Sequence, residues 1–218
     1  MNGQGLLDIV NQRASEHQQI WIIGCSFAHG SNLDDLNKRY GQLISVILNR
    51  PITFLTCPGS SISWAADQIL RSNIKKGDII IWGITSVERF MLYYKNKIFN
   101  VLNLSIEDDN FNHSDNDYPK EILRRNLVDE DRIMYAIKNI FQVDNFCKSV
   151  GTHLVLFPHH DLSSEESEKI LLSYIGSLDN CIIPSALVDY GNDKKHPGPL
   201  THKNWARELL TFIKEKGL

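Results

Sequence analysis

The sequence predicts an α/β fold in which helices cover both faces of a parallel β-sheet. Two observations predict it: short apolar runs of strand length recur along the chain, and segments with helical periodicity lie between them. With 218 residues, of which 42% are hydrophobic and 22% charged, the chain is long enough to bury a sizeable core. We therefore expect one domain over residues 1–218, built as a three-layer α/β/α sandwich.

Apolar runs predict the strands of the sheet. Each has about the length of a parallel strand that is buried on both faces. In such a sheet the ligand site lies outside the carboxyl ends of the strands, so residues that directly follow the runs are candidates for function. The runs are 20–23, 52–55, 78–82, 153–157 and 181–183, which predicts a five-stranded sheet.

Apolar residues three and four positions apart predict the helices between these strands. The last helix is expected from about 203 to 214. The apolar positions are Tyr40, Leu43, Ile44, Ile47 and Leu48; Ile62, Ala65, Ala66, Ile69 and Leu70; Ile133, Ile137, Ile140 and Phe141; and Trp205, Leu209, Leu210 and Ile213.

A polar and acidic interval at about 95–131 interrupts the alternation. Between 101 and 131 the sequence has nine Asp and Glu residues against three Lys and Arg. A connection of that length is usually functional or disordered. We interpret it as an insertion near the mouth of the site that acts as a lid, with a solvated surface excursion as the alternative.

Composition excludes several classes of function. The formal net charge of −3 offers no basic footprint for nucleic acid. No apolar run approaches the roughly 20 residues that span a bilayer, and the polar N-terminus does not resemble a signal peptide. We therefore expect a cytoplasmic location, with release by a route other than the general secretory one as the alternative. The four cysteines form no CxxC pair and are expected to be reduced thiols rather than disulfides or zinc ligands.

The first predicted strand leads into Gly24-Cys25-Ser26, a candidate nucleophile motif. Glycine at the strand end permits a tight turn, and a serine two residues later faces the cleft. A serine hydroxyl becomes an effective nucleophile only when a neighbouring base takes its proton. Because serine is common in turns between strands and helices, this motif alone does not identify an active site.

The segment Asp193-Lys194-Lys195-His196-Pro197 supplies the missing acid and base. A carboxylate three residues before a histidine in a turn reaches its Nδ1 atom, which fixes the tautomer and leaves Nε2 free to act as a base. Pro197 restricts His196 to extended backbone geometry. The order Ser…Asp…His predicts a triad of Ser26, Asp193 and His196.

Together the two motifs resemble the SGNH (GDSL-like) hydrolase family, whose first block is GxSxxxG and whose last block is DxxHP. Here these blocks are residues 24–30 and 193–197, and the usual GDS is GCS. The resemblance implies a flavodoxin-like α/β/α sandwich, Ser26 as nucleophile, and no cofactor or metal. The sequence does not match the other nucleophile motif, GxSxG, whose Asp and His lie far apart.

Two further blocks of the family would form the oxyanion hole together with the backbone N–H of Ser26. Gly59, after the second predicted strand, matches the family glycine whose N–H faces the site. After the third strand the family has GxND, whereas this chain has Gly83-Ile84-Thr85-Ser86, so Thr85 replaces the asparagine donor. A hydroxyl donates a hydrogen bond but is shorter than an amide. Compact phage and bacterial members of the family look similar at this block, which suggests a phage-encoded protein.

Other residues near the predicted site have weaker interpretations. His159-His160-Asp161 follows the fourth strand, but adjacent histidines diverge and no second ligand cluster accompanies them, so we expect cleft-wall residues rather than a metal site. His29 is interpreted as a helix-start or cleft-wall residue, and Cys25 as a neighbour of the nucleophile.

Arg89 and the aromatic residues after it have two interpretations each. Arg89 is either a substrate clamp or a partner of Glu88. The aromatic side chains form a core or a sugar-stacking wall, and for Phe90 we favour the core. The aromatic residues are Phe90, Tyr93, Tyr94 and Phe99.

The resemblance implies a serine hydrolase that cleaves an ester through an acyl-enzyme. The expected substrate is a small ester or acylated glycan, and a carbohydrate O-acetyl group is the first expectation. The alternative is a catalytically weak SGNH-like domain that binds a carbohydrate or a protein. The altered oxyanion block favours that alternative, whereas the retained triad opposes it.

Overall fold

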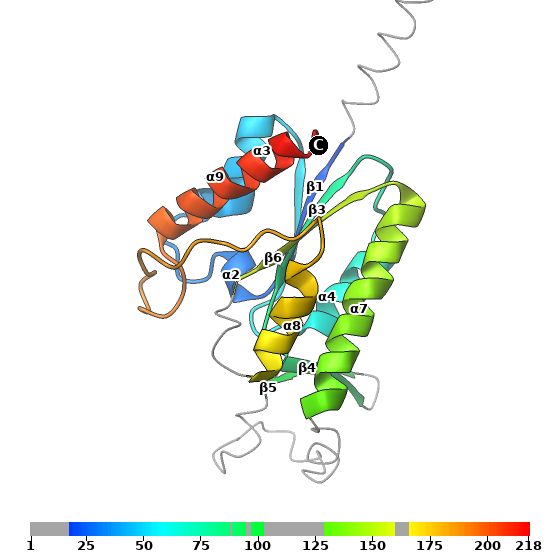
Figure 1. Ribbon diagram of the computed structural model, residues 1–218. Helices are drawn as coiled ribbons and strands as arrows, with labels where there is room; N and C mark the ends of the chain where they lie inside the picture. Colours follow the sequence, from blue (N-terminus) through cyan, green and yellow to red (C-terminus); the bar gives the residue numbers. More distant parts are fainter. Residues whose placement is uncertain (1–17, 88, 95–96, 103–128, 160–165) are drawn as a thin grey trace, which may run out of the picture.

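A computed structural model describes residues 18–87, 89–94, 97–102, 129–159 and 166–218. At its centre is a parallel sheet in the strand order β2-β1-β3-β6 (Figure 1). The strands are β1 (Ile20–Gly24), β2 (Ile52–Thr56), β3 (Ile79–Ile84) and β6 (His153–Pro158).

Helices cover both faces of this sheet, as the sequence predicts (Figure 1). On one face lie α3 (Tyr40–Leu48) and α9 (Pro199–Glu215), which contact each other. On the other lie α4 (Ile62–Arg71), α7 (Asp129–Val150) and α8 (Glu166–Gly176). The short helix α2 (Ser26–His29) and the 3₁₀ helix η1 (Leu36–Lys38) connect β1 to α3. The result is the predicted three-layer α/β/α arrangement.

Alternating strand residues build two separate cores. In β1, Ile20 and Ile22 face α3 and α9, while Trp21 and Ile23 face α4 and α7. The same alternation continues along β3 and β6, and nearly all of these side chains are fully buried. Because a parallel strand buries both faces, each strand reads as a continuous apolar run. This is why the apolar runs located the strands well.

Among the described residues the parallel sheet has four strands, and the segment predicted as the fifth forms a β-bridge instead. The predicted fifth strand, 181–183, contributes a single parallel bridge between Cys181 and Leu156. Leu156 donates its N–H to the carbonyl of Asn180 and accepts the N–H of Ile182, at 2.8 and 3.0 Å. Pro184 has no N–H to extend this ladder, so regular pairing stops at the position where the fifth strand was expected.

The predicted insertion at 95–131 contains regular structure at both ends. Strand β5 (Lys97–Leu102) pairs antiparallel with β4 (Arg89–Tyr94), and α7 begins at Asp129. Residues 103–128, which include most of the predicted lid, lie outside the described part of the chain. Two helices also differ from expectation: α8 was not predicted, and α9 begins four residues before the predicted start at 203.

Gly83 leaves room for His159 beside the central strand. A Cβ atom on Gly83 would lie 1.8 Å from Cε1 of the buried His159 ring. Gly83→Ala is therefore expected to destabilise the fold by at least about 2 kcal/mol, because an overpacked core must shift backbone or rings. Urea unfolding measures this. The matched control is Gly176→Ala in α8, where an added Cβ would meet no described atom within 4 Å beyond its chain neighbours and its own helix backbone, so the change should stabilise slightly. Equal stability of the two variants would contradict the prediction.

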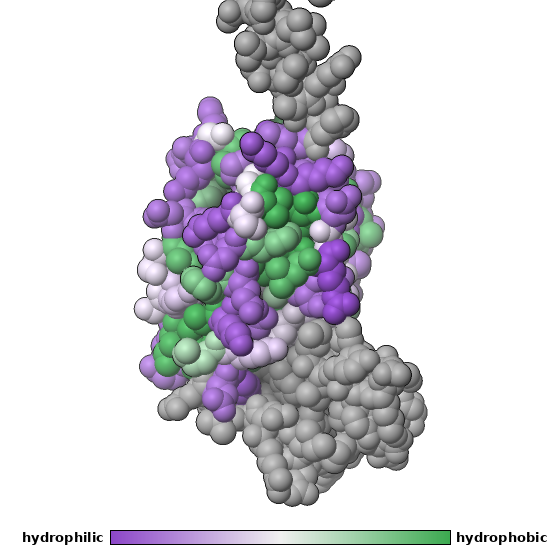
Figure 2. All heavy atoms as spheres, turned by 90° about the vertical axis from the view of Figure 1, so that its right-hand side faces the viewer, coloured by the Kyte–Doolittle hydropathy of each residue, from purple (hydrophilic) through white to green (hydrophobic). Residues whose placement is uncertain are grey.

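Figure 2 shows hydrophobic residues gathered on one face of the molecule. This is the face on which α7 lies in Figure 1. Met134 and Phe141 of α7 are more than half exposed. Within the described ranges, no helix is long and apolar enough to cross a membrane. All four cysteines lie among the described residues, and each is a free thiol in this structure.

Candidate active site

Ser26 lies where β1 ends and α2 begins. Gly24 makes this possible because its φ of +152° is disfavoured for other residues, and a Cβ there would lie 3.1 Å from both Ala28 Cβ and the carbonyl oxygen of Gly83. Cys25 precedes the helix and is fully buried, while Ser26 is 6% exposed. The strand end thus holds Ser26 at the carboxyl edge of the sheet, as the sequence predicts.

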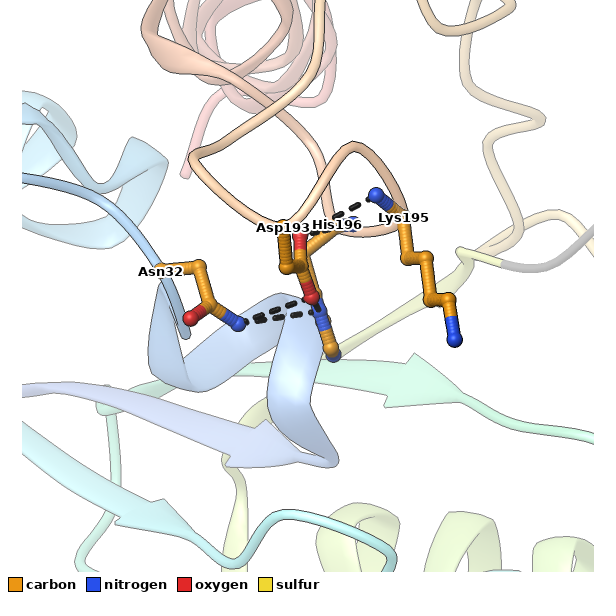
Figure 3. A network of polar contacts seen from close by, with 4 residues as sticks. All are labelled: Asn32, Asp193, Lys195 and His196. Atoms are coloured by element: carbon orange, nitrogen blue, oxygen red, sulfur yellow. Dashed lines mark hydrogen bonds and ion pairs between the residues drawn. The ribbon is translucent and has the colours of Figure 1, made fainter.

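Asp193 and His196 form the contact expected of an acid and a base. His196 Nδ1 lies 2.5 Å from Asp193 Oδ2 (Figure 3). With the proton of Nδ1 donated to this carboxylate, Nε2 is the ring atom left to accept a proton. Both side chains are about one quarter exposed, so the pair is open to solvent and substrate.

The carboxylate of Asp193 is held in its ionised form. The backbone N–H of His196, the His196 side chain and the backbone N–H of Lys195 lower the pKa of Asp193 to about 2, against a smaller effect of burial that raises it. Oδ1 accepts both backbone N–H groups at 3.0 Å. A carboxylate with several donors is stabilised in its charged form, which suits it to orient an imidazole.

The loop that carries this pair is fixed at its base. Asp189 accepts the backbone N–H groups of Leu200 and Thr201 at the start of α9, at 2.9 and 2.7 Å. Gly191 donates its N–H to the carbonyl of His196 at 2.8 Å. An antiparallel bridge between residues 190 and 197 closes the loop. The first turn of α9 and this bridge therefore determine where His196 lies.

Asn32, which the sequence patterns did not indicate, belongs to the same network. Its Nδ2 atom donates to Asp193 Oδ2 at 2.9 Å and lies 3.2 Å from His196 Nδ1 (Figure 3). Asn32 follows α2 in a left-handed conformation with a φ of +63°. An asparagine two residues after a glycine is a weak sequence signal, because asparagine is common in turns.

His196 packs beside the segment that contains Ser26. Its ring lies edge-on to the ring of Phe27, with centroids 5.6 Å apart and an interplanar angle of 72°. Phe27 in turn stacks on Trp205 of α9. The structure thus brings His196 against the residue adjacent to Ser26, although His196 and Ser26 lie 170 positions apart in the sequence.

Gly59 occupies a turn directly after β2. Ser60 donates its N–H to the carbonyl of Cys57 at 2.9 Å, and Gly59 has a φ of +78°. Proline at the second and glycine at the third position are typical of a type II turn. A Cβ on Gly59 would meet no atom of the described residues within 4 Å, apart from its chain neighbours. Cys57 donates its N–H to the carbonyl of Gly24, which places the turn next to the strand end that precedes Ser26.

Thr85 directly follows β3, which pairs with β1 on the side opposite β2. It is 2% exposed, and among the described residues its hydroxyl oxygen has no hydrogen-bond partner. A buried hydroxyl without a partner is costly, and such groups are often explained by a ligand or water. The three predicted oxyanion donors therefore follow three adjacent strands, β2, β1 and β3, at the same edge of the sheet.

Three further histidines have structural partners. His29 Nδ1 lies 3.0 Å from the hydroxyl of Thr56, and the buried His159 contacts the hydroxyl of Tyr40 at 3.0 Å and stacks on Trp205. Burial lowers the pKa of His202 to about 4, so this ring is neutral at pH 7 and accepts the backbone N–H of Tyr40. Residues 160 and 161 lie outside the described residues, which include no cluster able to hold a metal ion.

Arg89 begins β4 and is half-buried, and its Nε and Nη1 atoms have no partner in the described part of the chain. Glu88, its suggested partner, lies outside that part, so the two interpretations of Arg89 stay open. The predicted aromatic cluster lies in β4 and β5, and its side chains are not among those described. These residues are Phe90, Tyr93, Tyr94 and Phe99.

Comparisons with known proteins identify the fold. A carbohydrate esterase family 2 enzyme from Corynascus thermopiles (Myceliophthora fergusii) matches with a TM-score of 0.55 and 14% identity, over 92% of this chain and 67% of that one. A carbohydrate esterase whose active site has divergent catalytic and non-catalytic binding functions matches with a TM-score of 0.56 and 15% identity, over 91% of this chain and 68% of that one. A lipolytic protein of the G-D-S-L family from Desulfitobacterium hafniense matches with a TM-score of 0.56 and 9% identity, over 90% of this chain and 99% of that one.

These structures share an architecture rather than a closely related sequence with this chain. No protein-family model matches the sequence, and no curated protein matches it. At identities of 9 to 15% the likeness establishes the fold alone. The chain therefore has an SGNH hydrolase-like fold, as its first and last sequence blocks predicted.

Proposed function

We propose that this chain, with its SGNH hydrolase-like fold, is a serine esterase in which Ser26, His196 and Asp193 form the catalytic triad. One observation carries the proposal: the paired Asp193 and His196 lie against the α2 segment that begins at Ser26. A histidine whose Nδ1 is bound to an ionised carboxylate is prepared to act as a base through Nε2. A structural loop has no need of that arrangement.

The proposed reaction proceeds in two steps. His196 Nε2 takes the hydroxyl proton of Ser26 as Oγ bonds to the ester carbonyl carbon, and the protonated imidazole then gives this proton to the leaving alkoxide. Water attacks the acyl-enzyme, passes one proton to His196, and the carboxylic acid leaves as Ser26 regains its proton. The Ser26 and Gly59 N–H groups and the Thr85 hydroxyl would hold the developing oxyanion.

The proposed substrate is a small acyl ester, with an acetyl group on a carbohydrate as the first choice. Structural neighbours named as carbohydrate esterases support this class. The exposed position of the Asp193–His196 pair supports it too, because a bulky glycan needs open space beside the base. Neither the chemistry nor the triad requires a cofactor.

The experiment combines turnover with covalent labelling. We expect the purified chain to hydrolyse p-nitrophenyl acetate and to gain the mass of one fluorophosphonate adduct, located by peptide mapping on Ser26. An adduct on the adjacent Cys25 would reassign the nucleophile. Absence of both turnover and adduct would contradict the enzyme proposal. Acetylated xylan and mannan oligosaccharides, with acetate release as the readout, then test the substrate class.

A second candidate is a binding domain with weak catalysis. Thr85 in place of the family's asparagine donor favours it, and one structural neighbour is itself described as having non-catalytic binding functions. A chain of this kind would bind oligosaccharides in calorimetry while wild type and Ser26→Ala hydrolyse p-nitrophenyl acetate at equal rates.

A further inference from the structure

We propose that Asn32 is a positioning residue of this site, whose side-chain amide fixes the Asp193 carboxylate relative to the segment that carries Ser26. The inference rests on the proposed function, because it assigns a role within the same triad. Asn32 lies six positions after Ser26 and 161 positions before Asp193. It therefore links the nucleophile's segment directly to the acid.

The carboxylate of Asp193 has donors on both oxygens. Oδ1 accepts the backbone N–H groups of Lys195 and His196, both from its own turn. Oδ2 accepts His196 Nδ1 and Asn32 Nδ2. Of these four hydrogen bonds, the one from Asn32 comes from outside the 193–196 turn. The hydrogen bond from Asn32 therefore orients the acid relative to a second loop, whereas the other three hydrogen bonds come from the turn that contains Asp193.

An uncharged amide suits this role better than a cation would. The Asn32 amide donates a hydrogen bond to the carboxylate without neutralising it, so Asp193 keeps the negative charge that stabilises a protonated His196. Its Nδ2 atom lies 3.2 Å from His196 Nδ1, close enough to limit rotation of the ring. The amide thus restrains both members of the pair.

The backbone holds Asn32 firmly in place. Its φ of +63° is tolerated by asparagine, and its carbonyl accepts the N–H of Asn192 at 3.1 Å. Gly191 lies so close that a Cβ there would be 2.7 Å from the Asn32 carbonyl oxygen. On the other side, Ser31 donates its N–H to the carbonyl of Ser26 at 3.0 Å. A short and hydrogen-bonded path therefore connects Ser26 to Asn32.

A second contact between the same loops provides a matched control. Asn192 Nδ2 donates to Asp34 Oδ1 at 2.6 Å, a hydrogen bond that involves neither the Asp193 carboxylate nor the His196 ring. Loss of this contact weakens docking of the two loops while the carboxylate keeps its donors. Asn192→Ala therefore separates loop docking from positioning.

The experiment compares Asn32→Gly, Asn32→Asp and Asn192→Ala with wild type. Glycine tolerates the left-handed backbone, so Asn32→Gly removes only the amide. We expect it to lower kcat for p-nitrophenyl acetate by roughly tenfold with KM changed by less than about twofold, the size expected for one hydrogen bond to a charged group. Asn192→Ala should keep kcat within about twofold of wild type.

Asn32→Asp keeps the shape of the side chain but replaces a neutral hydrogen-bond donor with a negatively charged acceptor. A second carboxylate beside Asp193 and His196 favours the protonated imidazole, so the acid-side fall of kcat/KM should move to higher pH. An unmoved profile would mean that the side chain at position 32 does not face the Asp193–His196 pair and would contradict the positioning role. The titratable and charged groups of the two loops, residues 30–35 and 189–198, are Asp34, Asp35, Asp189, Tyr190, Asp193, Lys194, Lys195 and His196.

A proton NMR measurement tests the positioning role without turnover. The Hδ1 proton of His196, bound to Asp193, should give a downfield signal in wild type and in Asn192→Ala that weakens or shifts upfield in Asn32→Gly. Equal signals and equal kcat in the two variants would overturn the positioning role. A wild type with this signal but without esterase activity would sink the proposed function, and the signal in Asn32→Gly would still decide the role of Asn32.

Discussion

Replacing Ser26 by alanine is expected to lower kcat for p-nitrophenyl acetate by at least about 10⁴-fold, because the variant has no hydroxyl to form the acyl-enzyme. The rate that remains would come from the oxyanion donors and substrate binding alone. Ser26 is 6% exposed and alanine is smaller, so the fold should be retained. Steady-state kinetics with circular dichroism as the folding check measures this effect.

Ser31→Ala is the matched control for this variant. Ser31 lies in the same segment, and within the described residues its side chain makes no hydrogen bond. Its kcat should stay within about twofold of wild type, as expected for a side chain outside the reacting atoms. If Ser26→Ala kept more than about one tenth of the wild-type kcat, Ser26 would not be the nucleophile and Cys25 would become the next candidate.

Asp193→Asn is expected to lower kcat on the order of 10⁴-fold, the magnitude typical of this change in a Ser-His-Asp triad. An amide at this position presents an N–H₂ group toward His196 Nδ1, which favours the tautomer with its proton on Nε2. That tautomer cannot accept the proton of Ser26. Folding should persist, because the asparagine oxygen can still accept the backbone N–H groups of residues 195 and 196.

The low pKa of Asp193 also predicts the shape of the pH profile. Donors lower the pKa to about 2, so the carboxylate is charged above that pH and its charge is lost only as the pH falls through about 2. Loss of the Asp193 charge therefore contributes nothing to any fall in kcat/KM between about pH 7 and pH 4. Asp34→Asn is the matched control for Asp193→Asn. The side-chain oxygen of an asparagine at position 34 can still accept the hydrogen bond from Asn192, so the kcat of this variant should be nearly unchanged.

Two outcomes would contradict the role of Asp193. One is an Asp193→Asn variant with a kcat within about tenfold of wild type, since a misplaced tautomer costs far more. The other is an Asp34→Asn variant that loses as much activity as Asp193→Asn, which would make the effect one of loop docking. Both variants belong to the same pair of loops, so their comparison isolates the acid itself.

The positions of the predicted site residues follow from local patterns. Each of Ser26, Gly59 and Thr85 comes after an apolar strand, and parallel strands carry their carboxyl ends to one edge. The Asp193–His196 contact spans three residues, so the turn alone is enough to form it. These features depend on short stretches of the chain, which is why the amino-acid sequence alone predicts them.

Features outside the regular alternation of apolar strands and amphipathic helices were not predicted. The β4–β5 hairpin extends into an interval that reads as a polar insertion, and its pairing depends on a partner strand rather than on its own pattern. The fifth strand was predicted from its apolar residues, but Pro184 ends the pairing after a single bridge. Hydrophobic patterns indicate burial, whereas hydrogen-bond ladders depend on the neighbouring backbone.

Sequence patterns alone predict the α/β class, four of the strands, and the candidate triad of Ser26, Asp193 and His196. Three features come from the folded molecule instead: Asn32 donates to Asp193, Phe27 packs against His196, and Thr85 is buried with no hydrogen-bond partner among the described residues. The reason is physical. A strand, a turn or a cap is specified by residues a few positions apart, but a contact across 161 residues arises only when two loops dock on the same finished sheet.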